Sequence, residues 1–282
     1  MREIKFEERA VAFLDILGFT DFIKKAEKSE SDEYKKLCKL QEVIEAEIEA
    51  NGFHPRLKPD CKFFSDSVIL SAVVDKNNYA GLVGVTIKTI QITHQLLRMG
   101  FLVRGGIAVG LVSHSERNIF GTGYVDAYET ESKLAVTPRI LLHKSAAKIL
   151  DEGGLSSGWP IKTLTSFLRE GEQWIVDMLN PHENYIPSES QDAQKLFEGY
   201  RSTIIENLRQ HALGSSVRSK WEWMAEFFNW KLKDSSQLSG LEQIAISSIT
   251  PFKRENIETH SGTSFIKELG MRPMIGVIRV PH

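Results

Sequence analysis

The pattern of apolar positions alternates between strand-like and helix-like segments over the first 181 residues. Short apolar runs with many β-branched residues predict strands, and apolar residues three or four positions apart predict helices. The predicted strands lie at 9–16, 61–74 (two strands that meet at 65–67), 101–114, 138–143 and 172–179. The predicted helices lie at 19–27, about 34–50, 78–99, 120–135 and 144–150. This order predicts an α+β fold in which helices cover a mixed sheet.

The pattern changes near residue 181. Two helical stretches follow at 188–213 and 215–232, and a strand-like run closes the chain at 274–280. We therefore expect a first domain over 1–181 and a helix-rich C-terminal extension over 182–282, packed on it. Within the extension, aromatic residues recur at near-helical spacing, and such a stripe is typical of a packed core. They are Trp221, Trp223, Phe227, Phe228 and Trp230.

Composition narrows the class of protein. The 282 residues carry 35 Lys and Arg against 37 Asp and Glu, a formal charge of -2, which lacks the basic footprint of a nucleic-acid binder. The two cysteines, Cys38 and Cys61, show no disulfide or zinc spacing. The N-terminus has no signal-peptide pattern, and no run of about 18 apolar residues occurs. We expect a reduced, cytoplasmic protein that binds neither nucleic acid nor membrane.

Two acidic residues stand where predicted strands meet turns. Asp15 interrupts the apolar run AFLDILGFTDFI, and Asp66 lies between the two strands of CKFFSDSVILSAVV. A charge on an apolar strand is costly unless it is paired or binds a metal. If the first strand lies beside the hairpin, both carboxylates converge on one or two divalent cations, and Mg²⁺ and Mn²⁺ favour such oxygen ligands. The alternative is a pair of turn-forming or helix-capping residues.

Groups suited to phosphate flank the first acid. The turn after Asp15 enters a helix, so the backbone amides there are expected to point at an anion. These amides belong to Ile16, Leu17, Gly18 and Phe19. Arg104, in the strand pattern FLVRGGIAVG, is either a phosphate clamp or a salt bridge at the edge of the core. Metal ligands beside phosphate-binding amides indicate a nucleoside triphosphate.

Taken together, three stretches resemble the class III nucleotidyl cyclases. AFLDILGFTDFI is similar to the first metal-binding motif of that family, FFSDSVILSA to its second, and LVRGGIAVG to its R-x-G-I-x-x-G strand. The resemblance covers roughly residues 9–145 and implies a ferredoxin-like βαββαβ sheet. It also implies that Asp15 and Asp66 bind two divalent ions, Mn²⁺ or Mg²⁺, that Ile16 adds its carbonyl oxygen, and that Arg104 meets the triphosphate. Catalysis would then rest on Asp15, Asp66 and Arg104.

The chain departs from the family at the positions that stabilise the transition state and at the positions that contact the base. Aligning the Phe-Gly pair at 120–121 on the family's Trp-Gly pair puts Val125 and Glu129 where purine cyclases carry their transition-state Asn and Arg. Lys62 has the spacing of the adenine-contacting Lys, while Asn118 falls where the base-reading Asp would be. Lys62 and Asn118 are therefore candidates for binding a base other than the one a standard adenylyl cyclase selects.

Two further stretches are similar to the pyrimidine cyclases of bacterial Pycsar anti-phage systems: FGTGYVDAYETESKLAVTPRILL and SKWEWMAEFFN. This resemblance implies cyclisation of UTP to 3′,5′-cyclic UMP with release of pyrophosphate, or of CTP to cyclic CMP. The class III resemblance implies a head-to-tail homodimer with composite sites, and the resemblance to pyrimidine cyclases implies a product that acts on a separate effector protein. An adenylate cyclase and a non-catalytic nucleotide sensor remain the alternatives.

Overall fold

The computed structural model describes residues 4–28, 30–49, 58–75, 79–152, 166–182, 185–186, 192–246 and 257–259. Its strands are β1 (Glu7–Ile16), β2 (Asp60–Phe64), β3 (Ser67–Val73), β4 (Val103–His114), β5 (Ile119–Phe120), β6 (Ile140–Leu142), β7 (Phe167–Glu170), β8 (Gln173–Val176) and β9 (Ile257–Thr259). Its helices are α1 (Phe19–Ala26), α2 (Asp32–Glu49), α3 (Ala80–Arg98), α4 (Thr122–Glu129), α5 (Lys144–Asp151), α6 (Ala193–Gln210) and α7 (Ser216–Asp234), with a π-helical turn η1 (Thr130–Leu134) and a 3-10 turn η3 (Ser236–Leu238).

The sheet has the order β2-β3-β1-β4-β6-β8-β7-β9, and β5 pairs with β4 outside this path. Strand β1 is central and antiparallel to both β3 and β4, whereas β6 is parallel to β4. The first strands and helices follow the succession β1, α1 and α2, β2, β3, α3, β4, which is the ferredoxin-like βαββαβ arrangement. The predicted α+β fold is confirmed.

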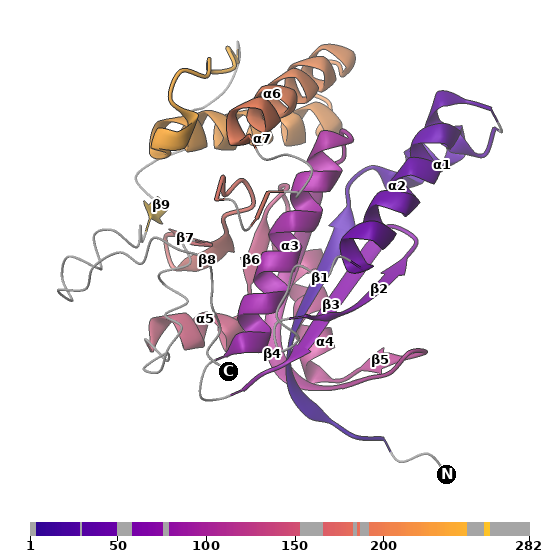
Figure 1. The fold of residues 1–282 in the computed structure, drawn as a ribbon, viewed down its shortest axis with the longest axis vertical. Coiled ribbons are helices and arrows are strands. Elements are labelled where there is room, and N and C mark those ends of the chain that lie inside the picture. The colour runs from indigo at the N-terminus through magenta and orange to yellow at the C-terminus, as the bar shows by residue number, and fades with distance from the viewer. Residues whose placement is uncertain are drawn as a thin grey trace.

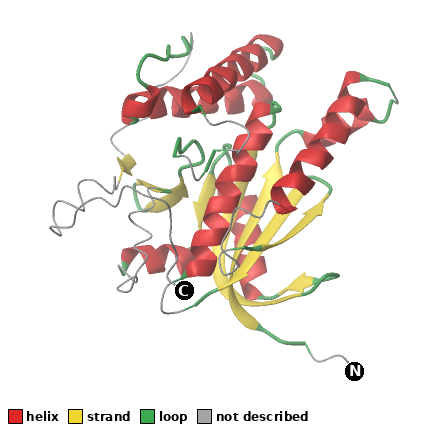
Figure 2. Ribbon diagram, viewed as in Figure 1, coloured by secondary structure: helices red, strands yellow, loops and turns green. Residues whose placement is uncertain are grey.

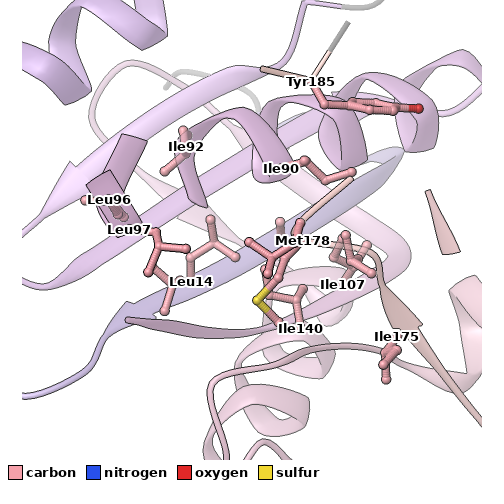
Figure 3. Packing of buried hydrophobic residues seen from close by; sticks show 14 of the residues in the cluster. Leu14, Ile90, Ile92, Leu96, Leu97, Ile107, Ile140, Ile175, Met178 and Tyr185 are labelled. Carbon is pink, nitrogen blue, oxygen red and sulfur yellow. The ribbon is translucent and has the colours of Figure 1, made fainter. Parts of the chain in front are cut away.

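Helices cover both faces of the sheet (Figure 1). Alternate residues of β1 point to opposite faces. Leu14 and Ile16 belong to the main core, which α3 covers, whereas Val11 and Phe13 belong to a second, smaller cluster with Ala127 of α4. Figure 3 shows the main core, where side chains from β1, α3, β4 and β6 meet. The face that carries Val11 and Phe13 also carries Asp15.

The C-terminal helices α6 and α7 lie across the end of α3 (Figure 2). On α3, the buried His94 has its Nδ1 2.7 Å from the hydroxyl of Tyr200 on α6. On α7, the buried Lys231 donates to Asp177 over 2.6 Å. Four aromatic residues of the predicted stripe are buried and Trp223 packs beside them, which confirms the packing role. They are Trp221, Phe227, Phe228 and Trp230.

Two features differ from the sequence-based expectations, and one expectation is not tested. The helix predicted over 120–135 ends at Glu129 and continues as the π-helical turn η1. The short strands β5, β7 and β9, of two to four residues each, were not predicted. The strand-like run 274–280 lies outside the described residues. Among the described residues, we find no helix with the length and hydropathy of a membrane span.

Candidate active site

Asp15 lies at the carboxyl end of β1, between two neighbouring strands. Its register partners are Ser67 on β3 and Arg104 on β4. The residues on either side, Leu14 and Ile16, are buried in the main core. Because side chains alternate along a strand, Asp15 points away from that core, and 19% of its side chain is exposed. The carboxylate is therefore accessible while its backbone is fixed in the centre of the sheet.

Asp66 occupies the tight turn between β2 and β3, next to the end of β1. The amide of Ile16 donates to the carbonyl oxygen of Asp66 over 2.9 Å, which ties this turn to the residue that follows Asp15. Ser65, just before Asp66, has a left-handed φ of 57°, a conformation uncommon for a residue other than glycine. The structure thus brings Asp15, Asp66 and Ile16 together at one end of the sheet.

Arg104 lies beside Asp15 on β4 and contacts three residues. Its Nε donates to Oδ2 of Asp15 over 3.0 Å, and the same nitrogen lies 2.7 Å from Oε1 of Glu131 on η1. Its Nη1 also donates to the carbonyl oxygen of Ala135 over 3.4 Å. Arg104 is therefore a member of a salt bridge at the site, and 29% of its side chain is exposed.

Glu131 is the site residue that the sequence analysis did not single out. Only 3% of its side chain is exposed, and burial raises its pKa to about 7; Arg104 opposes the shift, and Asp15 and Asp66 add to it. It reaches Arg104 because η1 lies directly on β4: a Cβ on Gly106 would be 2.3 Å from a backbone oxygen of α4 and 2.9 Å from the amide nitrogen of Glu131. The Gly105-Gly106 pair was the available signal, since paired glycines in a strand mark close backbone approach.

The prediction that four backbone amides bind phosphate is corrected for two of them. The amide of Ile16 donates to Asp66 and that of Leu17 donates to the carbonyl oxygen of Leu102 over 2.8 Å, so neither is available to an anion. The amides of Gly18 and Phe19 have no backbone acceptor within the described residues. Gly18 caps α1 with a left-handed φ of 77° and no side-chain hydrogen bond. Two of the four predicted amides thus remain at the helix N-terminus.

Lys62 and Asn118 lie in a second region of the same sheet face. Lys62 donates its Nζ to the carbonyl oxygen of Glu116 over 3.0 Å, so it contacts the β4–β5 turn that contains Asn118. His114 of this hairpin lies 2.6 Å from the hydroxyl of Ser71 on β3. Among the described residues, no hydrogen bond or ion pair joins Lys62 or Asn118 to Asp15 or Asp66. The structure therefore joins Lys62 to the turn that carries Asn118, and no such contact joins either residue to the acids.

Val125 and Glu129 occupy exposed positions on α4. Val125 is 48% exposed, and Glu129 forms an ion pair with Lys133 over 2.7 Å, one helical turn later. Among the described residues, no hydrogen bond or ion pair joins Glu129 to Asp15, Asp66 or Arg104.

The acids at the end of β1 fit a hard divalent cation. The carboxylates of Asp15 and Glu131 both contact the guanidinium of Arg104, and Asp66 is near enough to Glu131 to add to its pKa shift. When fully ionised, these three carboxylates and one guanidinium carry a surplus of two negative charges. The described residues contain no group of three or more His, Cys, Asp or Glu arranged to hold a metal. Two carboxylates and one carbonyl oxygen suffice for Mg²⁺ or Mn²⁺ when substrate phosphates supply further ligands.

Comparisons with known proteins give matches among solved structures. No protein-family model and no curated protein matches it. The catalytic core of a rhodopsin-guanylyl cyclase with converted specificity, solved with ATPαS, is 19% identical, with 53% of this chain and 84% of that chain covered and a TM-score of 0.38. The monomeric guanylyl cyclase domain of the RhoGC fusion protein from the aquatic fungus Blastocladiella emersonii is 16% identical, with 62% and 98% covered and a TM-score of 0.41.

Proposed function

We propose that this protein is a nucleotidyl cyclase that converts UTP into 3′,5′-cyclic UMP and pyrophosphate. The observation that carries the proposal is the convergence of Asp15 and Asp66 at one end of the sheet, linked by the Ile16 amide and flanked by Arg104. Structural acids seldom gather at the end of an apolar strand, because each would need its own compensation. Divalent cations bound with a triphosphate supply that compensation, and the phosphates pair with the guanidinium of Arg104.

In the proposed reaction the ribose 3′ oxygen attacks the α-phosphorus. The bond between the α-phosphorus and the oxygen bridging to the β-phosphate breaks, pyrophosphate leaves, and the hydroxyl proton passes to solvent. Arg104 stabilises negative charge on the phosphates, and the free amides of Gly18 and Phe19 add to this at the α1 N-terminus. The rigid central strand β1 keeps these groups in register, so positioning contributes a large part of the rate enhancement.

Asp15, Asp66 and the carbonyl oxygen of Ile16 would hold the two ions, Mn²⁺ or Mg²⁺. When bound, such ions acidify the attacking hydroxyl and neutralise charge on the leaving pyrophosphate. Glu131 does not join this set in our proposal, because its carboxylate is buried against Arg104 over 2.7 Å. Its role is to hold the guanidinium in place.

The choice of UTP rests on the resemblance to pyrimidine cyclases and on the α4 positions. Val125 and Glu129 cannot supply the amide and guanidinium that purine cyclases place there, and both face solvent. CTP is the alternative pyrimidine substrate. An adenylate cyclase would form cyclic AMP instead, and a non-catalytic sensor would bind nucleotide without turnover.

A head-to-tail homodimer would bring the two regions of the sheet face together. Within one chain the acids and the pair Lys62 and Asn118 are separate, whereas a two-fold axis would set the acids of one chain opposite the base candidates of its partner. Large apolar side chains on α4 and at the β2–β3 hairpin are exposed, which suits burial in such an interface. They include Val125, Tyr128 and Phe64.

We further propose that the extension over 182–282 braces the catalytic domain over 1–181. The contact of His94 with Tyr200 and the buried ion pair of Lys231 with Asp177 support that role. In the cell, the cyclic nucleotide would act on a separate effector during anti-phage defence, as the resemblance implies.

The test is a product assay. The purified protein is incubated with Mn²⁺ and each of the four ribonucleoside triphosphates, and the products are resolved by mass spectrometry. Cyclic UMP with pyrophosphate is the expected result. Dominant cyclic CMP or cyclic AMP would replace the substrate assignment, and nucleotide binding without turnover would identify the sensor.

A further inference from the structure

A row of charged residues crosses the sheet at the end that carries the acids. Asp15 on β1 is the register partner of Arg104 on β4. The next residue of β4, Gly105, is the parallel partner of Ile140 on β6, and its amide donates to the carbonyl oxygen of Arg139 over 3.1 Å. Arg139 therefore stands beside Arg104, about 4.8 Å away in the direction of the strand-to-strand hydrogen bonds.

Arg139 points to the same face of the sheet as Arg104. A Cβ on Gly105 would contact Leu14 and Ile140, so these residues face the main core. The positions just before Gly105 and Ile140 face the opposite way, because side chains alternate along extended chain. Both guanidinium groups thus lie on the face where Asp15 is exposed.

Arg139 has capacity for a further ligand. Its Nη1 forms an ion pair with Oε2 of Glu170 over 2.6 Å, and about a quarter of each side chain is exposed. Its Nε is buried and has no hydrogen-bond acceptor among the described residues. The hydroxyl of Thr137, two positions earlier, is also buried and has no hydrogen-bond partner there. A buried guanidinium nitrogen without an acceptor is costly, and an anion that reaches it removes that cost.

We infer that Arg139 is a second phosphate-binding residue, which receives the β- and γ-phosphates of the substrate and the pyrophosphate product. The inference rests on the proposed function, because the acids define where the α-phosphate lies. A triphosphate held at Asp15 and extended along the charged row passes Arg104 first and reaches Arg139 next. Glu170 forms the ion pair with Arg139 when no anion is bound, and the phosphates replace Glu170 as the partner of Arg139 when they bind.

The test measures binding of inorganic pyrophosphate, with Mg²⁺ present, by titration calorimetry. Arg139→Gln is expected to weaken pyrophosphate binding about ten- to a hundredfold, the effect of losing hydrogen bonds to a charged group. Glu170→Gln is expected to bind pyrophosphate as tightly as the wild type or more tightly, since Arg139 is then free. Arg169→Gln is the matched control, because Arg169 is adjacent to Glu170 and pairs with Asp151 instead.

A purely structural ion pair gives a different pattern. In that case Arg139→Gln and Glu170→Gln weaken pyrophosphate binding equally, and this result overturns the inference, as does wild-type affinity in Arg139→Gln. If Arg139→Gln does not fold, Arg139→Lys keeps the ion pair; at least threefold weaker pyrophosphate binding is expected, and unchanged binding overturns the inference. The proposed function is tested separately by the product assay. If the wild type binds pyrophosphate through Arg139 but forms no cyclic nucleotide, this inference holds and only the proposed activity is wrong.

Discussion

The guanidinium of Arg104 and the carboxylate of Asp15 face each other across neighbouring strands, with Nε 3.0 Å from Oδ2. Without a cation, Arg104 compensates the charge of Asp15, and a divalent ion at Asp15 must compete with that contact. Glu131 lies 2.7 Å from the same Nε and can retain the guanidinium when Asp15 turns to an ion. A divalent cation can therefore replace Arg104 at Asp15 while the half-buried guanidinium keeps Glu131 as its partner.

Replacing Asp15 is expected to abolish cyclisation without unfolding the protein. Asp15→Asn keeps the shape of the side chain but removes the charge that a divalent cation needs. Product formation should fall below detection, and the unfolding midpoint in urea should change little because Arg104 keeps Glu131 as a partner. Asp21→Asn is the control, since that carboxylate on α1 is 82% exposed. Cyclic nucleotide production by Asp15→Asn would contradict the assignment.

Removing Arg104 is expected to separate metal binding from turnover. Arg104→Gln eliminates the positive charge beside Asp15, so Mn²⁺ affinity should rise about two- to fivefold, the effect of a partly exposed pair worth about 0.5–1 kcal/mol. Turnover should fall, because the phosphates lose a charged donor. Electron paramagnetic resonance of free Mn²⁺ measures the affinity, and a product assay measures turnover. Weaker Mn²⁺ binding in this variant would show that Arg104 supports the ion site instead of competing with it.

Glu131 is expected to make stability depend on pH. Its pKa is raised from 4.5 to about 7 in the folded protein, so between these values the folded state holds a proton that the unfolded state has lost. Its contribution to stability is therefore complete below about pH 4.5 and is lost as the pH rises through about 7. Glu131→Gln removes this dependence.

The measurement is urea unfolding of wild type and Glu131→Gln in the presence of a chelator, at a series of pH values. The free energy of unfolding of the wild type, taken relative to the variant, should fall from pH 4.5 to about 7 and then level off. All other titrating groups are shared and cancel in the difference. Two parallel curves would mean that Glu131 stays ionised throughout.

Mixing two inactive variants tests the composite site. If the acids and Lys62 act across a two-fold axis, Asp15→Asn and Lys62→Ala inactivate complementary halves of each site. Random reassociation places both intact halves together in about a quarter of all sites, so a mixture should recover about a quarter of wild-type turnover. Each variant alone is the control. No recovery after mixing, with subunit exchange shown by mass spectrometry, would contradict a shared site.

The sequence by itself determined the local elements and the candidate acids. The β-branched apolar run around Asp15, the turn at Ser65 and Asp66, and the helical spacing of α3 depend on neighbours within a few residues, so periodicity exposes them. Asp15 could be recognised as a candidate because its immediate neighbours in the sequence are apolar. A glycine pair at 105–106 also marked the place where another segment approaches closely.

Only the tertiary structure decided which groups meet. Glu131 reaches Arg104 because η1 packs directly onto Gly106, 25 positions earlier in the chain, and no local pattern encodes that contact. The amides of Ile16 and Leu17 looked free in the sequence, yet carbonyl oxygens of distant segments occupy them. Hydrogen-bond partners and ion pairs across strands depend on the register of the sheet, which residues far apart in the chain set together.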